Sequence, residues 1–259
     1  MDTPVWFHDP AGHRIAAVLA VPPRPTTSLA VLCHGFLSGK NSTTNKAVTR
    51  ALLDKGIATF RFDFFGQGES EGPFEALTTT LAVTQAMAAL DLVVQQGFRR
   101  IGLMGSSFGG LVAILTAAQR TDLACLTLKC PVVDFAEELR LEFGDTEMTR
   151  WKTTGTIPNI MGGTDRIALR YAFYEDSLQR IAYDPARTIT APTLIVQGER
   201  DEHVPLHQSR RLHEALRVEK RLELLPDADH QFTRGEDFTR MTGLIVDWLT
   251  TYLAPGPER

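Results

Sequence analysis

The sequence predicts an α/β fold, with a mostly parallel, doubly wound sheet, an antiparallel N-terminal hairpin and a small inserted cap. Short apolar runs alternate with stretches of helical spacing, which is typical of parallel strands connected by helices. The first 21 residues form two strand-like runs around a tight turn. Residues 131–190 break the alternation. We therefore predict a body of residues 1–130 and 191–259, with 131–190 inserted as a cap.

The predicted strands rest on apolar runs bounded by turn residues. The hairpin strands, 5–8 and 14–21, flank the turn Asp9-Pro10-Ala11-Gly12. The continuous apolar run at 29–33, which ends at His34-Gly35, is typical of a strand buried on both faces. Further strands are predicted, in chain order, at 57–62, 100–104, 123–130, 193–197 and 221–225.

The predicted helices rest on end signals and on apolar spacing. Ser42 is expected to cap a helix that runs to about residue 53, and Gly97 is expected to end a helix that starts near residue 79. Further helices are predicted at 109–119, from beyond residue 197 to about 216, and at 238–253, the last with an apolar stripe. Within the cap we find only a turn at Gly162-Gly163, and we expect the C-terminal PGPER to fray.

Composition excludes several classes of function. Of the 259 residues, 43% are hydrophobic and 22% charged, the balance of a globular protein with a sizeable core. The net charge of −4 does not suggest a nucleic-acid partner. No apolar run approaches the roughly 18 residues of a membrane span. The N-terminal residues lack a basic stretch followed by an apolar one, so we expect no secretory signal and a cytoplasmic protein.

The cysteines point to the same compartment. Cys33, Cys125 and Cys130 each lie in an apolar, strand-like stretch, which predicts buried free thiols in a reducing environment. No C-x-x-C or H-E-x-x-H spacing occurs, so we expect no metal and no other cofactor.

The candidate nucleophile is Ser107. Residues Gly105 to Gly109 read G-S-S-F-G and match G-x-S-x-G between a predicted strand and a predicted helix. A serine on such a sharp turn needs small neighbours, because side chains on both flanks would clash. Ser106 lacks the symmetric glycine flanks, and we interpret it as structural.

The candidate base and acid follow at the ends of later strands. His230 lies in a loop directly after the last predicted strand, whereas His207 and His213 fall on a predicted helix. Asp201 follows the strand at 193–197 and is the expected acid; Asp134, which follows the preceding strand, is its competitor. In this arrangement histidine takes the serine proton, and the aspartate orients the imidazole.

Two backbone N–H groups are expected to form an oxyanion hole. The first belongs to Phe108, directly after the nucleophile, and the second to Phe36, in the loop after the strand at 29–33. Each such donor is worth about 3 kcal/mol of barrier. His34 in the same loop is interpreted as a hydrogen-bonding residue that shapes it.

Taken together, HGF, RFDFFGQGESEG, GSSFGG, GERDEHVP and DADHQF resemble the α/β-hydrolase superfamily. The segment RFDFFGQGESEGPFE is similar in sequence to a loop of bacterial feruloyl or cinnamoyl esterases. The resemblance implies the α/β-hydrolase fold and a serine carboxylesterase whose inserted segment lies over the site. It also implies substrate contacts from that segment, for which we name Asp134 and Tyr171.

Three functions are therefore weighed. The first is hydrolysis of carboxylic esters of small or aromatic acids. The second is cleavage of thioesters or amides by the same triad, since the acyl-enzyme steps are shared. The third is a binding module on an inactive hydrolase scaffold, which is disfavoured because all three triad candidates are present. A small-molecule ester is the expected partner; a homodimer through the cap or the antiparallel edge is left open.

Overall fold

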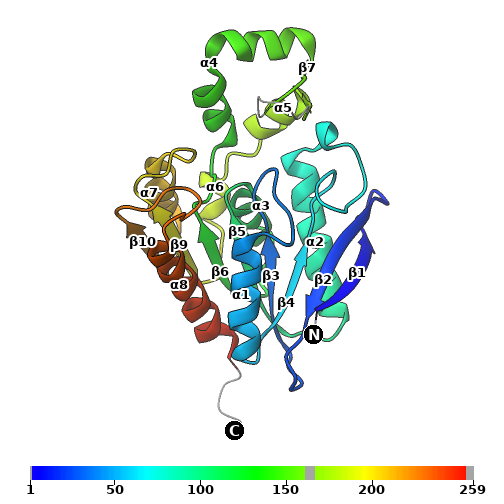
Figure 1. The fold of residues 1–259 in the computed structure, drawn as a ribbon, viewed down its shortest axis with the longest axis vertical. Helices are drawn as coiled ribbons and strands as arrows, with labels where there is room; N and C mark the ends of the chain where they lie inside the picture. Colours follow the sequence, from blue (N-terminus) through cyan, green and yellow to red (C-terminus); the bar gives the residue numbers. More distant parts are fainter. Residues whose placement is uncertain (1, 161–166, 255–259) are drawn as a thin grey trace.

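Figure 1 shows the fold of a computed structural model that describes residues 2–160 and 167–254. The predicted turn at Gly162-Gly163 and the tail from residue 255 lie outside the described residues. An eight-stranded sheet, in the order β1-β2-β4-β3-β5-β6-β9-β10, forms the middle layer. Strands β1 and β2 are antiparallel, β2 is antiparallel to β4, and all later neighbours are parallel. The predicted mostly parallel sheet with an antiparallel N-terminal hairpin is confirmed.

The strands lie close to their predicted positions. They are β1 (Asp2–His8), β2 (Arg14–Ala20), β3 (Ser28–Cys33), β4 (Ala58–Phe62), β5 (Arg100–Ser106), β6 (Leu123–Lys129), β9 (Thr193–Gly198) and β10 (Lys220–Leu225). All six residues of β3 and all six of β9 are buried, as continuous apolar runs in a covered parallel sheet should be. Strand β5 continues two residues beyond the predicted end, so Ser107 comes directly after it.

Helices cover both faces of the sheet (Figure 1). On one face, α1 (Thr43–Asp54) and α8 (Gly235–Leu253) pack against each other and share one buried apolar cluster with the strands. On the other face, α2 (Thr79–Gln95), α3 (Phe108–Ala117) and α7 (Leu206–Ala215) contribute to a second cluster. The predicted cap of α1 forms, because Ser42 Oγ accepts the N–H of Asn45 at 3.2 Å.

Residues 131–190 leave the sheet after β6 and return to it at β9. They contain α4 (Phe135–Thr154), β7 (Thr156–Ile157), β8 (Leu169–Arg170), α5 (Ala172–Leu178) and α6 (Tyr183–Ala186), and a short 3-10 turn, η1 (Phe74–Ala76), packs against β8. In Figure 1, α4, β7 and α5 protrude beyond the carboxyl ends of the strands, whereas α6 lies beside α3 and α7. The prediction that residues 131–190 form a cap therefore stays a proposal, and it concerns the part of this segment from α4 to α5.

A cluster of phenylalanine rings joins the protruding part to the body. The ring of Phe36, in the loop after β3, lies 5.7 Å from that of Phe108, 5.4 Å from that of Phe135 and 5.3 Å from that of Phe173. Such separations are typical of edge-to-face aromatic packing. The first turns of α3, α4 and α5 therefore meet on one ring.

Within residues 2–160 and 167–254, no helix combines the length and the apolar character that crossing a bilayer requires.

Candidate active site

Ser107 occupies a strained turn between β5 and α3. It has φ of 52° and is the N-cap residue of α3. The glycines beside it allow this turn: a Cβ on Gly105 would lie 2.2 Å from the Gly109 carbonyl oxygen, and one on Gly109 would lie 2.4 Å from the carbonyl oxygens of Cys33 and His34. These contacts leave no room for a side chain on either flank of Ser107, which is the reason predicted for the glycines of G-x-S-x-G.

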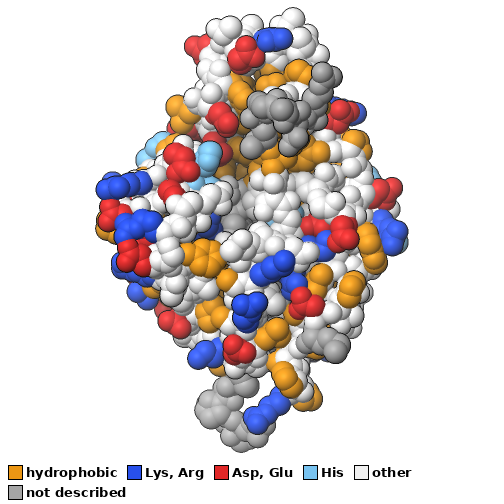
Figure 2. Space-filling model, viewed as in Figure 1, with side chains coloured by type: hydrophobic (Ala, Val, Ile, Leu, Met, Phe, Trp, Pro, Cys, Tyr) orange, Lys and Arg blue, Asp and Glu red, His pale blue; other side chains and the backbone are white. Residues whose placement is uncertain are grey.

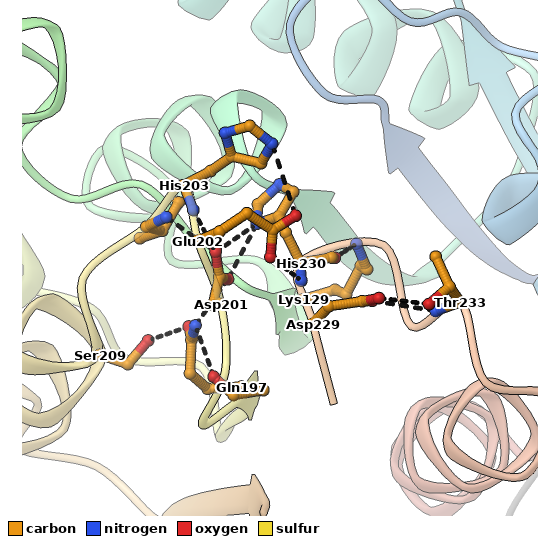
Figure 3. A network of polar contacts seen from close by, with 11 residues as sticks. Lys129, Gln197, Asp201, Glu202, His203, Ser209, Asp229, His230 and Thr233 are labelled. Carbon is orange, nitrogen blue, oxygen red and sulfur yellow. Dashed lines mark hydrogen bonds and ion pairs between the residues drawn. The ribbon is translucent and has the colours of Figure 1, made fainter. Parts of the chain in front are cut away.

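Asp201 and His230 meet across the loops that follow β9 and β10. Nδ1 of His230 lies 2.8 Å from Oδ2 and 2.9 Å from Oδ1 of Asp201 (Figure 3). Both side chains are almost completely buried, at 6% and 1% exposed. With Nδ1 donating, Nε2 of His230 is left as the acceptor nitrogen of the neutral ring, the state a general base needs.

Asp201 is held by several donors besides His230. Its Oδ1 accepts the backbone N–H groups of His203 and Val204 at 2.9 and 2.8 Å, and its Oδ2 accepts Nε2 of Gln197 at 2.7 Å. Burial by itself raises the pKa of Asp201, but the His230 hydrogen bond and charge and the Val204 N–H outweigh it and lower that pKa below its ordinary value. Asp201 is therefore a fixed, ionised carboxylate.

Ser107 and His230 face one cavity of about 420 Å³. No hydrogen bond joins the Ser107 hydroxyl to the His230 ring in the part of the chain that the structure describes. Contacts of this kind are often long in a free enzyme and tighten when substrate binds. The competing serine, Ser106, pairs with Lys129 in the sheet and does not line this cavity.

The two expected oxyanion donors flank Ser107. Phe108 opens α3, and its N–H is one of the first-turn donors that a helix leaves without a partner. The loop that carries Phe36 lies against Ser107, since a Cβ on Gly35 would be 3.4 Å from Cβ of Ser107. Neither N–H donates to another group among the described residues. Both N–H groups are therefore available to donate to an oxygen atom bound beside Ser107.

His34 shapes the loop that carries Phe36. Its Nδ1 donates to the Gly35 carbonyl at 2.7 Å, and its Nε2 accepts the N–H of Phe64 at 3.0 Å. Burial lowers the pKa of His34 to about 4, although the Gly35 hydrogen bond and the charge of Asp63 act in the opposite direction. Both ring nitrogens are engaged, so His34 has no free nitrogen for substrate.

The other wall of the cavity comes from the inserted segment. Phe135, Glu138, Leu139 and Glu142 of α4 line it together with Ile160. Burial, followed by the charges of Glu142 and Asp201, raises the pKa of Glu138 well above its ordinary value, and its Oε2 is buried without a hydrogen-bond partner. Figure 2 shows acidic and histidine side chains gathered where the protruding part meets the body.

The family of this chain follows from a comparison of its sequence with known families. Residues 30–239 match the sequence model described as "Alpha/beta hydrolase family". The chain belongs to that family. The matched range contains Ser107, Asp201 and His230, and the α/β-hydrolase fold expected from the sequence is confirmed.

Similar proteins include serine hydrolases and thioesterases of the family. The chain is 24% identical to the mouse (Mus musculus) serine hydrolase BPHL over 85% of its own length and 79% of that protein. It is 23% identical to the mitochondrial palmitoyl-protein thioesterase ABHD10 of Pongo abelii over 84% of its length and 71% of that protein. Among solved structures, Est1E from Butyrivibrio proteoclasticus with bound ferulic acid superimposes with a TM-score of 0.83 at 25% identity, covering 97% of this chain and all of that one.

Two side chains predicted to contact substrate, those of Asp134 and Tyr171, have other contacts in this structure. Asp134 is the N-cap of α4, where Oδ1 accepts the N–H of Glu137 at 2.9 Å. Tyr171 begins α5, and its ring packs against Trp151 and Tyr174. Neither lines the 420 Å³ cavity. Among the described residues, His230 Nδ1 contacts Asp201 and not Asp134, the competing candidate for the acid.

Glu138, Leu139 and Glu142 were not among the predicted site residues, because no helix was predicted within residues 131–190. A signal was available: Asp134 and Glu137 have the spacing of a helix N-cap and its third residue. A helix starting there would have placed residues 138, 139 and 142 on neighbouring turns. Lys129 was also overlooked, although a lysine that ends an otherwise apolar strand is itself unusual.

One group of three side chains has the donor types of a metal site. Atoms of Cys130, Asp201 and His230 lie within 4.8 Å of one another. The 2.8 Å between Nδ1 of His230 and Oδ2 of Asp201, however, is a hydrogen-bond distance. Two ligands of a tetrahedral zinc ion, each about 2.0 Å from it, are roughly 3.3 Å apart. The group therefore fits a hydrogen-bonded pair better than a metal centre, and the sequence-based expectation of no metal stays a prediction.

Proposed function

We propose that this protein is a serine hydrolase that cleaves carboxylic esters of small or aromatic acids through Ser107, His230 and Asp201. The observation that carries the proposal is the buried contact of His230 Nδ1 with both oxygens of Asp201, in a ring that shares one cavity with Ser107. That contact leaves Nε2 as a base on the cavity side. Membership of the α/β-hydrolase family supports the same chemistry.

The proposed reaction has two halves. His230 takes the proton of Ser107 as Oγ attacks the ester carbonyl, and the N–H groups of Phe36 and Phe108 stabilise the oxyanion. The protonated ring then gives its proton to the leaving alcohol, and an acyl-Ser107 ester remains. Water, activated by His230, attacks this ester and releases the acid. Asp201 stays ionised throughout and stabilises the imidazolium.

The walls of the cavity favour an acid of modest size. A volume of about 420 Å³ lies at the lower end of the range of small-molecule pockets. Phe36, Phe135 and Leu139 give an apolar and partly aromatic lining near Ser107. An aromatic acyl group suits such a lining, and the likeness to the ferulic-acid complex of Est1E supports this choice.

The test is turnover of p-nitrophenyl esters of increasing acyl length and of methyl ferulate, with Ser107→Ala as the control. We expect the variant to lose at least about 10⁴-fold in kcat, because the covalent route is removed, while its unfolding free energy stays close to that of the wild type. If the wild type hydrolyses none of these esters, or if the alanine variant is equally active, the proposal is wrong.

A thioester substrate is the second candidate, favoured by the similarity to a palmitoyl-protein thioesterase. The same assay with acyl-CoA thioesters matched in acyl length separates the two. For an ester hydrolase, kcat/KM on the ester should exceed that on the matched thioester; the reverse order would favour the thioesterase.

A further inference from the structure

Lys129 is a buried cation at the carboxyl end of the central strand β6. Its relative exposure is 4%, and the rest of LACLTLK is apolar apart from one threonine. None of the ion pairs formed within the described residues includes it, whereas the other buried lysine, Lys40, pairs with Asp63 and Glu69. Burial of a cation without a carboxylate partner is unfavourable, so the position of Lys129 calls for an explanation.

The side chain of Lys129 holds the loop of the proposed base. Its Nζ donates to the backbone carbonyl of His230 at 2.6 Å, across 101 residues of sequence (Figure 3). The same Nζ lies 5.2 Å from the ring centre of Phe232, a residue of that loop with φ of 54°. A carbonyl oxygen and the face of an aromatic ring are both neutral groups that attract an ammonium.

The backbone of Lys129 holds the proposed nucleophile. Its carbonyl accepts the N–H of Ser107 at 2.9 Å, and in the sheet Lys129 pairs with Ser106 on β5. On its other side it pairs with Val196 of β9, the strand that leads to Asp201. One residue therefore contacts the Ser107 turn and the His230 loop directly, and lies beside the strand of the acid.

We propose that Lys129 is a positioning residue that sets the placement of His230 relative to Ser107. This inference rests on the proposed function, in which His230 accepts the Ser107 proton. Lys129 does not line the 420 Å³ cavity, so its loss should leave substrate binding intact. A misplacement of about 1 Å between reacting groups can lower the rate 100-fold, which makes the rate of the chemical steps the sensitive quantity.

The test compares Lys129→Met, which keeps an unbranched side chain one atom shorter and removes charge and donor, with Lys220→Met. Lys220 also donates to backbone carbonyls, those of His213 and Leu216 at 2.6 and 2.8 Å, but it lies on the edge strand β10, away from the cavity. We expect Lys129→Met to lower kcat on a p-nitrophenyl ester between about 10- and 100-fold, with KM within twofold of wild type. Its urea midpoint should equal or exceed that of wild type, because an apolar isostere removes the cost of the buried charge. Lys220→Met should keep the wild-type kcat and KM.

A folded Lys129→Met protein with kcat within twofold of wild type would overturn the inference, as would an equal loss in Lys220→Met. If Lys129→Met does not fold, Lys129→Gln replaces it. Its side chain is one bond shorter and cannot keep the 2.6 Å contact, so the same loss of kcat is expected and an unchanged kcat again overturns the inference.

The rate of labelling by a fluorophosphonate separates this inference from the proposed function. The reagent reports how strongly Ser107 is activated and needs no knowledge of the natural substrate. Labelling of wild type with a tenfold slower rate in Lys129→Met supports the inference even if the ester assignment fails. Equal rates overturn the inference alone, and no labelling of wild type overturns both.

Discussion

The two walls of the cavity are built in different ways. Ser107 follows β5 and His230 follows β10, two strands of the parallel part of the sheet, so both lie close to backbone whose hydrogen bonds are fixed by the sheet. The opposite wall comes from one helix, α4, which protrudes from the body and is interrupted at Gly144 by a non-helical φ of 66°. The body thus holds the proposed reacting groups, and the inserted segment lines the opposite side of the cavity.

This difference predicts how each wall responds to change. A change at the strand ends should act on the rate of the chemical steps. A change on α4 should alter which acyl group is accepted, and it should alter stability. The α4 residues that line the cavity make no hydrogen bond to the proposed triad among the described residues. The charge of Asp201 does act on Glu138 of this helix. The following three substitutions test the contrast.

The largest effect is expected from Asp201→Asn on the body wall. The amide keeps the shape but can present its NH₂ to His230, which favours the wrong tautomer, so kcat/KM should fall about 10⁴-fold. Steady-state kinetics on a p-nitrophenyl ester measures it. A comparable loss in Asp134→Asn, the substitution at the competing acid, would contradict the assignment of Asp201.

A smaller effect is expected from Leu139→Ala on the α4 wall. Leu139 is 2% exposed and lines the cavity, so truncation should enlarge the acyl site. The ratio of kcat/KM for a longer over a shorter acyl ester should rise about tenfold, since one or two methylene groups are worth about 1–3 kcal/mol in such a pocket.

The matched control is Leu141→Ala on the same helix, whose side chain is 65% exposed and lines no part of this cavity. It should leave the acyl preference of the wild type unchanged. A shift in Leu141→Ala as large as that in Leu139→Ala would mean that α4 acts through its overall fold rather than through the cavity wall.

The smallest effect is expected from Glu138→Gln, and it depends on pH. Burial raises the pKa of Glu138 in the folded protein, so the folded state holds its proton over a pH range in which the unfolded chain has lost it. Folding free energy is therefore lost as pH rises from the ordinary carboxyl pKa through the raised one. Glutamine does not titrate, so the variant should gain on the order of 1 kcal/mol over wild type at pH 8 and little at pH 4. Urea unfolding at the two pH values measures the gain, and an equal difference at both would exclude this titration as the cause.

The elements and the candidate residues of the body wall could be predicted from the sequence because their signals are local. The first glycine of G-x-S-x-G reflects a close approach of Gly105 to the Gly109 carbonyl within the same turn, and Ser42 satisfies a helix end three residues away. His230 and Asp201 were predicted to lie together because loops at the carboxyl ends of parallel strands converge at one edge. These rules need no knowledge of distant contacts.

The α4 wall could not be predicted in the same way. Helix α4 has buried residues at only a few positions, and its interruption at Gly144 breaks any regular apolar spacing. Asp134 was read as a substrate contact although it caps the helix, since a carboxylate after a strand suits either use until the helix is seen. The contact of Lys129 with His230 spans 101 residues, and no local pattern encodes it.

The ring cluster around Phe36 has a consequence for protein engineering. Phe36 and Phe108 supply the proposed oxyanion donors through their backbones, and their rings pack against Phe135 and Phe173 of the inserted segment. The segment is therefore not an interchangeable module. A chimera that receives residues 131–190 from a relative would have to receive that relative's partners at positions 36 and 108 as well, because mismatched rings would displace the loops that carry the donors.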